Sequence, residues 1–152
     1  MNIVLHEPEI PHNTGAIGRT CLMTGAGLHL IRPMGFFLDE KSLKRAGMDY
    51  WPQINVREYN DFGHFMEANP GIRFHLVETG GVKTYAKADY KPGDFLVFGS
   101  ESKGLPTWLL KEYSSQIVSI PMAGSERSLN LSVSAGIVLY EALRQNNFNG
   151  LV

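Results

Sequence analysis

The sequence predicts an α/β fold in which a mostly parallel sheet is covered by helices on both faces. Short apolar runs alternate along the chain with longer helical segments, an arrangement typical of parallel sheets. Polar, glycine-containing stretches follow three of these runs, at residues 12–19, 98–106 and 120–132. Because ligands of such sheets bind beyond the carboxyl ends of the strands, these stretches predict one shared site.

Composition restricts the class of protein. The chain has 152 residues, 43% hydrophobic and 19% charged, and we treat residues 1–152 as a single globular domain. No apolar run reaches the ~20 residues that span a membrane, and the first run ends at Glu7 without forming a signal peptide. One cysteine, Cys21, cannot form an internal disulfide, and no Cys/His spacing indicates zinc. We therefore expect a cytoplasmic protein without a metal.

Six strands are predicted from short apolar runs bounded by turn residues. They lie at residues 2–6, 28–31, 54–58, 73–77, 95–98 and 117–120. Pro8 and Pro11 end the first run, and the loop signals at residues 79–81 and 91–94 flank a weakly structured stretch. The sheet is thus expected to be built from strands well separated along the chain.

Helices are predicted between these strands. The first has Asn13 or Thr14 as its cap and ends at Gly27. A short basic helix is expected at residues 39–47, another helix at 61–68, and a brief one that begins at Pro106. The last helix is expected at residues 130–147.

The last helix is more apolar than a helix with one buried stripe. Its apolar and aromatic residues cover far more than one face. Burial against the sheet explains one side, and a second subunit or the first helix of the same chain explains the other. The pattern favours a homodimer, in which Gly136 permits close approach.

The first polar stretch can bind an anion, because a helix N-terminus offers free N–H groups. Gly15 and Arg19 are four residues apart, so Arg19 is expected to lie over the space that Gly15 leaves empty. A phosphate or ribose clamp is one interpretation, and a surface arginine on an ordinary amphipathic helix is the other. His12 is interpreted as a loop residue rather than a base.

The second and third polar stretches carry further candidates. Glu101 lies between Gly99 and Gly104, and a turn alone does not explain it. Neither a Walker A nor a dinucleotide-binding glycine pattern is present. Ser128 or Asn130 can cap the last helix, so a structural role for either is a strong alternative.

Together the three stretches resemble the three motifs of the SpoU-type branch of the SPOUT methyltransferases. Asn13-x-Gly15-x-x-x-Arg19 resembles the first motif, residues 98–106 the second and residues 120–134 the third. Their order and spacing make the signal specific, although each motif is weak alone. Residues 5–15, 32–36 and 45–50 further resemble the compact tRNA wobble-position 2′-O-methyltransferases of that family, and the likeness covers nearly the whole chain.

The resemblance implies a SPOUT fold with a deep C-terminal trefoil knot within about residues 73–152. It also implies a homodimer, S-adenosylmethionine as cofactor, and tRNA bound at its anticodon stem-loop. The reaction implied is 2′-O-methylation of the ribose of cytidine or uridine 34, in leucine tRNAs. By motif, the cofactor-binding residues are Leu76, Thr79, Gly80, Gly99, Ile120, Ser128 and Leu129. The catalytic residue is Arg19, with Asn13, Glu101 and Asn130 in support.

Some alternatives remain open at this stage. Arginine is a poor base because its guanidinium stays protonated, so a clamp on phosphate and oxyanion is preferred over proton abstraction by Arg19. Glu101 is expected to orient Arg19 or the sulfonium side of the site. Ala16 stands where relatives commonly have asparagine, which leaves the fine geometry of the substrate open. Other RNA positions, a non-catalytic RNA-binding module and a nucleotide-binding oxidoreductase are the competing functions.

Overall fold

The computed structural model describes residues 1–38, 48–124 and 128–152. Within these ranges the strands are β1 (Asn2–His6), β2 (Gly27–Ile31), β3 (Val56–Tyr59), β4 (Phe74–Val77), β5 (Lys83–Thr84), β6 (Phe95–Phe98) and β7 (Ile117–Ser119). The helices are α1 (Pro11–Thr24), α3 (Phe62–Ala68), α4 (Thr107–Glu112) and α5 (Leu131–Gln145), with short 3-10 turns η1 (Trp51–Gln53), η2 (Tyr85–Lys87) and η3 (Ser114–Gln116). The strands form one parallel sheet in the order β3-β2-β1-β6-β4-β7-β5. The predicted α/β class is confirmed.

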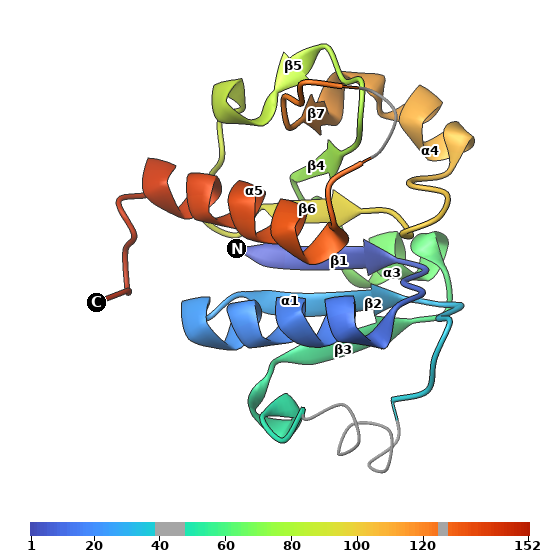
Figure 1. Ribbon diagram of the computed structural model, residues 1–152, viewed down its shortest axis with the longest axis vertical. Helices are drawn as coiled ribbons and strands as arrows, with labels where there is room; N and C mark the ends of the chain where they lie inside the picture. The colour runs from blue at the N-terminus through green and yellow to red at the C-terminus, as the bar shows by residue number, and fades with distance from the viewer. Residues whose placement is uncertain (39–47, 125–127) are drawn as a thin grey trace.

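Helices cover both faces of this sheet. Helices α1 and α5 lie side by side on one face, nearest the viewer in Figure 1, and α3 lies behind the sheet. Alternating strand residues supply the two cores, since successive side chains point to opposite faces. Ile3 and Leu5 pack with α1 and α5, whereas Val4 packs with Phe65 of α3 and Leu109 of α4. The central strands are therefore apolar on both sides, as parallel sheets require.

The register of the central strands brings their carboxyl ends together. Leu5 of β1 pairs with Phe98 of β6, and Phe98 pairs with Val77 of β4. Val77 in turn pairs with Val118 of β7. The loops that follow these four strands consequently leave the sheet at one edge, as the sequence predicts.

Helix α1 begins earlier and ends earlier than predicted. Pro11 occupies its first turn and Ile10 is its N-cap without a side-chain cap, because Asn13 uses its side chain elsewhere. Gly25, not Gly27, terminates the helix with a φ of 68°. Glycine adopts this left-handed conformation without the penalty that a Cβ imposes. Gly27 instead begins β2.

The other element boundaries differ modestly from the predictions. The strand β5 was not predicted, because Lys83 and Thr84 form only two residues of edge strand inside a polar stretch. Pro106 is the N-cap of α4 rather than its first helical residue. Asn130 is confirmed as the N-cap of α5, since its side chain accepts from the backbone of Ser132 and Val133. The predicted helix at residues 39–47 lies outside the described residues.

A buried polar network lies away from the strand-end loops, around His29 of β2. His29 is 4% exposed and stacks on Tyr59, with ring centroids 5.7 Å apart. Its Nδ1 lies 2.8 Å from the Tyr59 hydroxyl, and its Nε2 lies 3.3 Å from Oδ1 of Asn2. Burial lowers the pKa of His29 from 6.5 to about 4, with a further contribution from the charge of Arg57. The imidazole is therefore neutral at pH 7.

The trefoil knot stays a prediction. The strand order and the described contacts are compatible with a knot but do not demonstrate it. Among the described residues, no helix is both long and apolar enough to cross a membrane.

Candidate functional site

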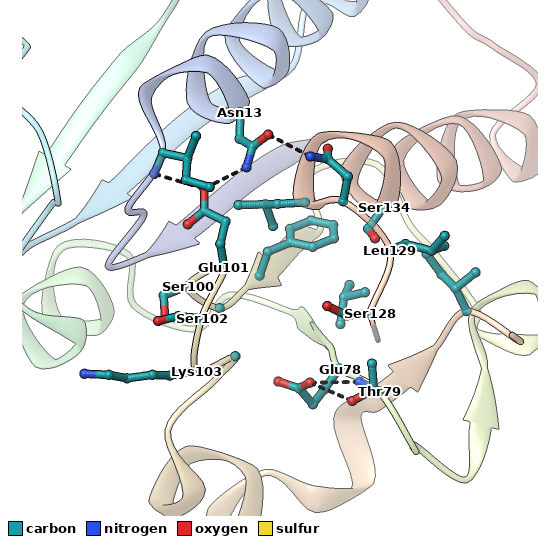
Figure 2. Close-up of a pocket in the computed structure, with 18 of the residues that line it drawn as sticks. Asn13, Glu78, Thr79, Ser100, Glu101, Ser102, Lys103, Ser128, Leu129 and Ser134 are labelled. Atoms are coloured by element: carbon teal, nitrogen blue, oxygen red, sulfur yellow. Dashed lines mark hydrogen bonds between the residues drawn. The ribbon is translucent and has the colours of Figure 1, made fainter. Parts of the chain in front are cut away.

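A cavity of about 400 Å³ lies at the carboxyl edge of the sheet, between α1, α5 and the loops after β4, β6 and β7. Figure 2 shows its lining, which mixes carboxylates, hydroxyls and apolar side chains. The lining comprises Ile10, Asn13, Val77, Glu78, Thr79, Phe98, Gly99, Ser100, Glu101, Ser102, Lys103, Gly104, Ile120, Met122, Ser128, Leu129, Asn130, Leu131 and Ser134. We call it the strand-end cavity. Its volume falls in the range of small-molecule and cofactor sites.

Glu101 fastens the loop after β6 to the start of α1. Its Oε2 accepts from the backbone N–H of Glu9 at 2.8 Å. Its Oε1 accepts from the backbone N–H of Ile10 at 3.1 Å and from Nδ2 of Asn13 at 2.9 Å. Hydrogen bonds to an ionised acceptor are stronger than neutral ones, so this carboxylate fixes one wall of the cavity.

Asn13 continues this chain of hydrogen bonds to α5 (Figure 2). Its Oδ1 accepts from Nδ2 of Asn130 at 2.9 Å. The Oδ1 of Asn130 accepts from the backbone N–H groups of Ser132 at 2.9 Å and Val133 at 3.3 Å. Both amides are thus oriented by their partners, and Glu101, Asn13 and Asn130 join the three polar stretches into one unit.

Glu9 forms a second brace between the same two loops. Its carboxylate accepts from the backbone N–H of Ser102 at 2.8 Å and from the Ser102 hydroxyl at 2.7 Å. These two hydrogen bonds from Ser102 hold the pKa of Glu9 below its ordinary value. Glu9 and Glu101 therefore each bind the loop that carries the other.

Glu78, directly after β4, supports the same loop from the opposite side. Its Oε2 accepts from the backbone N–H of Leu105 at 2.8 Å, and its Oε1 accepts from the backbone N–H of Thr79 at 2.9 Å. A Cβ on Gly104, whose φ is 68°, would lie 2.6 Å from Oε2 of Glu78. A Cβ on Gly99 would lie 2.0 Å from the backbone of Gly104. Gly99 is required because neighbouring backbone lies too close for a side chain, and Gly104 because of its positive φ and the Glu78 carboxylate beside it.

The structure brings most of the predicted site residues to this cavity. Those that line it are Asn13, Thr79, Gly99, Glu101, Ile120, Ser128, Leu129 and Asn130. Leu76 is the exception among the apolar ones, because its side chain is fully buried in the core and its neighbour Val77 lines the cavity instead. Gly80 does not line the cavity.

Sequence reasoning missed Glu78; Lys103, Met122 and Ser134 lie within the predicted second and third motifs but had no assigned role in the cavity. A charged residue directly after an apolar strand, as at Glu78, is a signal that could have found it.

Arg19 lies apart from the strand-end cavity, contrary to the expected placement over Gly15. Its guanidinium carbon is 5.9 Å from the centroid of the Tyr50 ring. Met48 fills the space over Gly15, since a Cβ there would lie 2.6 Å from the Met48 sulfur. The Tyr50 hydroxyl donates to the Gly15 carbonyl at 2.9 Å. Glu101 consequently orients Asn13 and the α1 loop, and the expectation that it orients Arg19 is not met.

The described residues form no cluster of metal-ligating side chains. In the three described ranges, no group of three or more His, Cys, Asp or Glu side chains is placed to hold a metal ion. The donors in the strand-end cavity suit an organic ligand.

A parallel sheet whose strand-end loops enclose a cofactor-sized cavity is the arrangement in which α/β proteins bind small molecules and cofactors. The chain belongs to the SpoU rRNA methylase family, whose model matches residues 1–140. It is 44% identical over 153 residues to the tRNA (cytidine(34)-2′-O)-methyltransferase of Escherichia coli K12, covering 100% of this chain and 98% of that protein.

Solved structures show the same fold. One, which concerns 2-OH methylation of C/U34 on tRNA, is 45% identical with a TM-score of 0.89, over 96% of this chain and 95% of its own. A second is the SpoU methyltransferase AviRb of Streptomyces viridochromogenes in complex with AdoMet. It is 28% identical with a TM-score of 0.83, over 97% of this chain and 58% of its own.

Proposed function

We propose that this protein transfers a methyl group from S-adenosylmethionine to the ribose 2′-hydroxyl of cytidine or uridine 34 in tRNA. The observation that carries the proposal is the Glu101–Asn13–Asn130 chain, which unites three separate loops around one cavity. The reaction follows from the likeness to full-length relatives named for it. We place the protein in the cytoplasm, with its substrate.

The strand-end cavity fits S-adenosylmethionine. Its apolar members Val77, Ile120 and Leu129 suit an adenine ring. Ser128 and Thr79 offer hydroxyls to the ribose, and Glu78 and Glu101 offer negative charge to a cationic ligand. The bound cofactor supplies an electrophilic methyl group attached to a sulfonium.

The residues of the chain then serve to position the hydroxyl. The 2′-oxygen forms a bond to the methyl carbon while the carbon–sulfur bond breaks, and the hydroxyl proton leaves to solvent or a nearby base. Placing the reacting atoms in line supplies much of the acceleration. Arg19 binds the adjacent phosphate and stabilises negative charge on the oxygen, because an arginine guanidinium stays protonated and cannot act as a base.

This role for Arg19 requires a second copy of the chain. Arg19 is exposed on α1 and does not line the strand-end cavity of its own chain. It lies in a row with Ala16 and Met23, the latter 64% exposed. Beside it, α5 exposes Val133 at 50% and Tyr140 at 49%.

We call these exposed rows of α1 and α5 the helical face. Residues four and seven positions apart share one side of a helix, so each row is continuous. A Cβ on Gly136 would meet no atom within 4 Å, so the middle of the face is open. We propose that two copies pair through this face as a homodimer, with the Arg19 of one copy serving the cavity of the other.

The RNA is recognised at the anticodon stem-loop, where unpaired bases are accessible. Leucine tRNAs are the proposed substrates. Phosphate contacts from basic side chains make binding fall steeply with salt. A flat salt dependence contradicts this part of the proposal.

The test is incubation of the protein with labelled S-adenosylmethionine and bulk tRNA from cells that lack this modification. Nucleoside mapping is expected to place the label on the 2′-oxygen of nucleotide 34. Label at another tRNA position, or in ribosomal RNA alone, overturns the assignment to nucleotide 34. Absence of transfer to any RNA overturns the enzymatic function.

A further inference from the structure

A second cavity adjoins the strand-end cavity on the other side of the loop after β6. Its volume is about 530 Å³, and it lies between the ends of β1 and β2, the start of α3 and the start of α4. Ser100, Lys103 and Gly104 line both cavities, so a single loop separates them. We call it the Trp108 cavity.

Trp108 offers an aromatic surface in this cavity. It is 52% exposed, so about half of its surface is open to a ligand. Its ring meets Phe62 edge to face, with centroids 5.8 Å apart and planes at 77°. Phe62 is itself buried and anchors the indole. A fixed, half-exposed indole is a suitable platform for a stacked base, because every base has a π-face.

The polar lining favours a nucleobase over a bare phosphate. Glu7 and Asp61 bring carboxylates, which accept hydrogen bonds from base amino groups and repel phosphate. One Asp61 oxygen already accepts from the backbone N–H of His64, at 2.8 Å. Arg32 is paired with Glu58. Lys103, at the wall between the cavities, is the cation best placed for a phosphate that joins two neighbouring nucleotides.

The backbone at Glu7 gives a separate indication of function. Its φ is 52°, in the left-handed region that few residues other than glycine adopt. Such conformations cluster at ligand-binding sites, where the surrounding structure imposes them. Glu7 is held by its backbone N–H, which donates to the Ile31 carbonyl at 2.9 Å, and this turn directs the chain around the cavity mouth.

We propose that the Trp108 cavity binds an unpaired nucleobase of the RNA substrate, from a nucleotide next to the methylated one. The base stacks on Trp108, its N–H donors meet Glu7, and the linking phosphate lies at Lys103. Since the two cavities share a wall, the occupant is attached to the nucleotide that receives the methyl group. The inference rests on the proposed function and adds a second point of RNA recognition to it.

The test combines Trp108→Ala with anticodon stem-loop RNAs that lack one base, at either neighbour of nucleotide 34. With intact RNA, Trp108→Ala is expected to raise KM by about 5- to 150-fold, the range for loss of one stacked base, with kcat little changed. One of the abasic RNAs should show the same loss with the unaltered protein, and no additional loss with Trp108→Ala. Independent, additive losses for both abasic RNAs overturn the proposal.

Further variants separate stacking from folding. Trp108→Phe should bind RNA nearly as well as the unaltered protein, because it keeps an aromatic ring. Trp108→Leu keeps an apolar contact to Phe62 but should bind RNA as weakly as Trp108→Ala. Phe148→Ala, an exposed aromatic on the chain after α5, is the matched control and should leave KM unchanged. If Trp108→Leu binds RNA as the unaltered protein does, the inference fails while methylation stands. If the unaltered protein methylates no RNA, the proposed function fails first.

Discussion

Arg19 has an exposed guanidinium on the helical face and no contact with the cavity of its own chain. Arg19→Ala is expected to keep S-adenosylmethionine binding within about twofold and to abolish methyl transfer, because charge on the 2′-oxygen loses its stabilising partner. Calorimetric titration of the cofactor and label transfer to tRNA measure the two effects. Arg57→Ala removes an exposed arginine from β3 and serves as the control. Full turnover by Arg19→Ala removes this residue from the mechanism.

Glu101 is expected to contribute both to the stability of the fold and to cofactor binding. Glu101→Gln keeps one acceptor oxygen but turns an amide NH₂ toward the backbone N–H of either Glu9 or Ile10, which then lacks an acceptor. We expect a loss of about 1–3 kcal/mol in the free energy of unfolding, and weaker S-adenosylmethionine binding. Denaturant unfolding and calorimetry measure the two effects. Unchanged values for both would show that the wall between the loops is held by other contacts.

The lowered pKa of His29 makes the free energy of unfolding depend on pH. The folded pKa of about 4 lies below the ordinary 6.5, so between these values the unfolded chain binds a proton that the folded chain does not. The stability that His29 contributes is thus complete above pH 6.5 and is lost as pH falls toward 4. From pH 7 to 4.5 the loss is roughly 2–3 kcal/mol.

The measurement compares unfolding free energies at the two pH values for the unaltered protein and for His29→Gln. The variant should show a loss smaller by that amount, whatever its stability at pH 7. Equal losses in both proteins would mean that His29 titrates in the folded state near its ordinary pKa.

At the level of elements, Gly18 shows packing overriding helix propensity. A Cβ at this position in α1 would lie 2.8 Å from Ile54 and 3.0 Å from Trp51. Gly18→Ala gains about 1 kcal/mol of helix propensity but overpacks the η1 contact, which typically costs 1–3 kcal/mol. We therefore expect Gly18→Ala to lower the melting temperature, measured by thermal unfolding. A stabilised Gly18→Ala would contradict the packing argument.

The central elements could be predicted because their signals are local. Apolar runs such as residues 95–98 identified the strands, and Asn130 identified the start of α5 by its capping preference. The start of α1 could not be predicted in the same way. The side chain of its cap candidate Asn13 instead donates a hydrogen bond to Glu101, 88 residues away along the chain. Such long-range pairings leave no local pattern in the sequence. The two-residue strand β5 is likewise defined only by its partner β7.

The site was predictable as a meeting of strand-end loops, but not in its internal contacts. Parallel strands align their carboxyl ends, so three polar stretches had to approach one another. The hydrogen-bond partners of Glu101 depend on how the loop before α1 folds back. The position of the Arg19 side chain depends on where Met48 and Tyr50 lie. These are tertiary facts that spacing along a helix cannot supply.

For the molecule as a whole, the helical face predicts the oligomeric state. Tyr140→Glu places a charge at the centre of this face, four residues before Arg144, where the helix itself tolerates it. We expect a monomer by light scattering, with loss of methyl transfer because Arg19 no longer reaches a partner. Val82→Glu alters an exposed apolar residue away from this face and is the control. A fully dimeric and active Tyr140→Glu would exclude the helical face as the interface.

The direction of the amides between Glu101 and α5 has a consequence for how the protein ages. Deamidation of Asn13 would replace a donor nitrogen with a second anion beside the Glu101 carboxylate, which makes the contact repulsive. The same change at Asn130 would remove the Nδ2 group that donates a hydrogen bond to Oδ1 of Asn13. Deamidation at either position would therefore break the hydrogen-bond chain while the two hydrophobic layers of the domain stay assembled, and mass spectrometry would detect it as a gain of one mass unit.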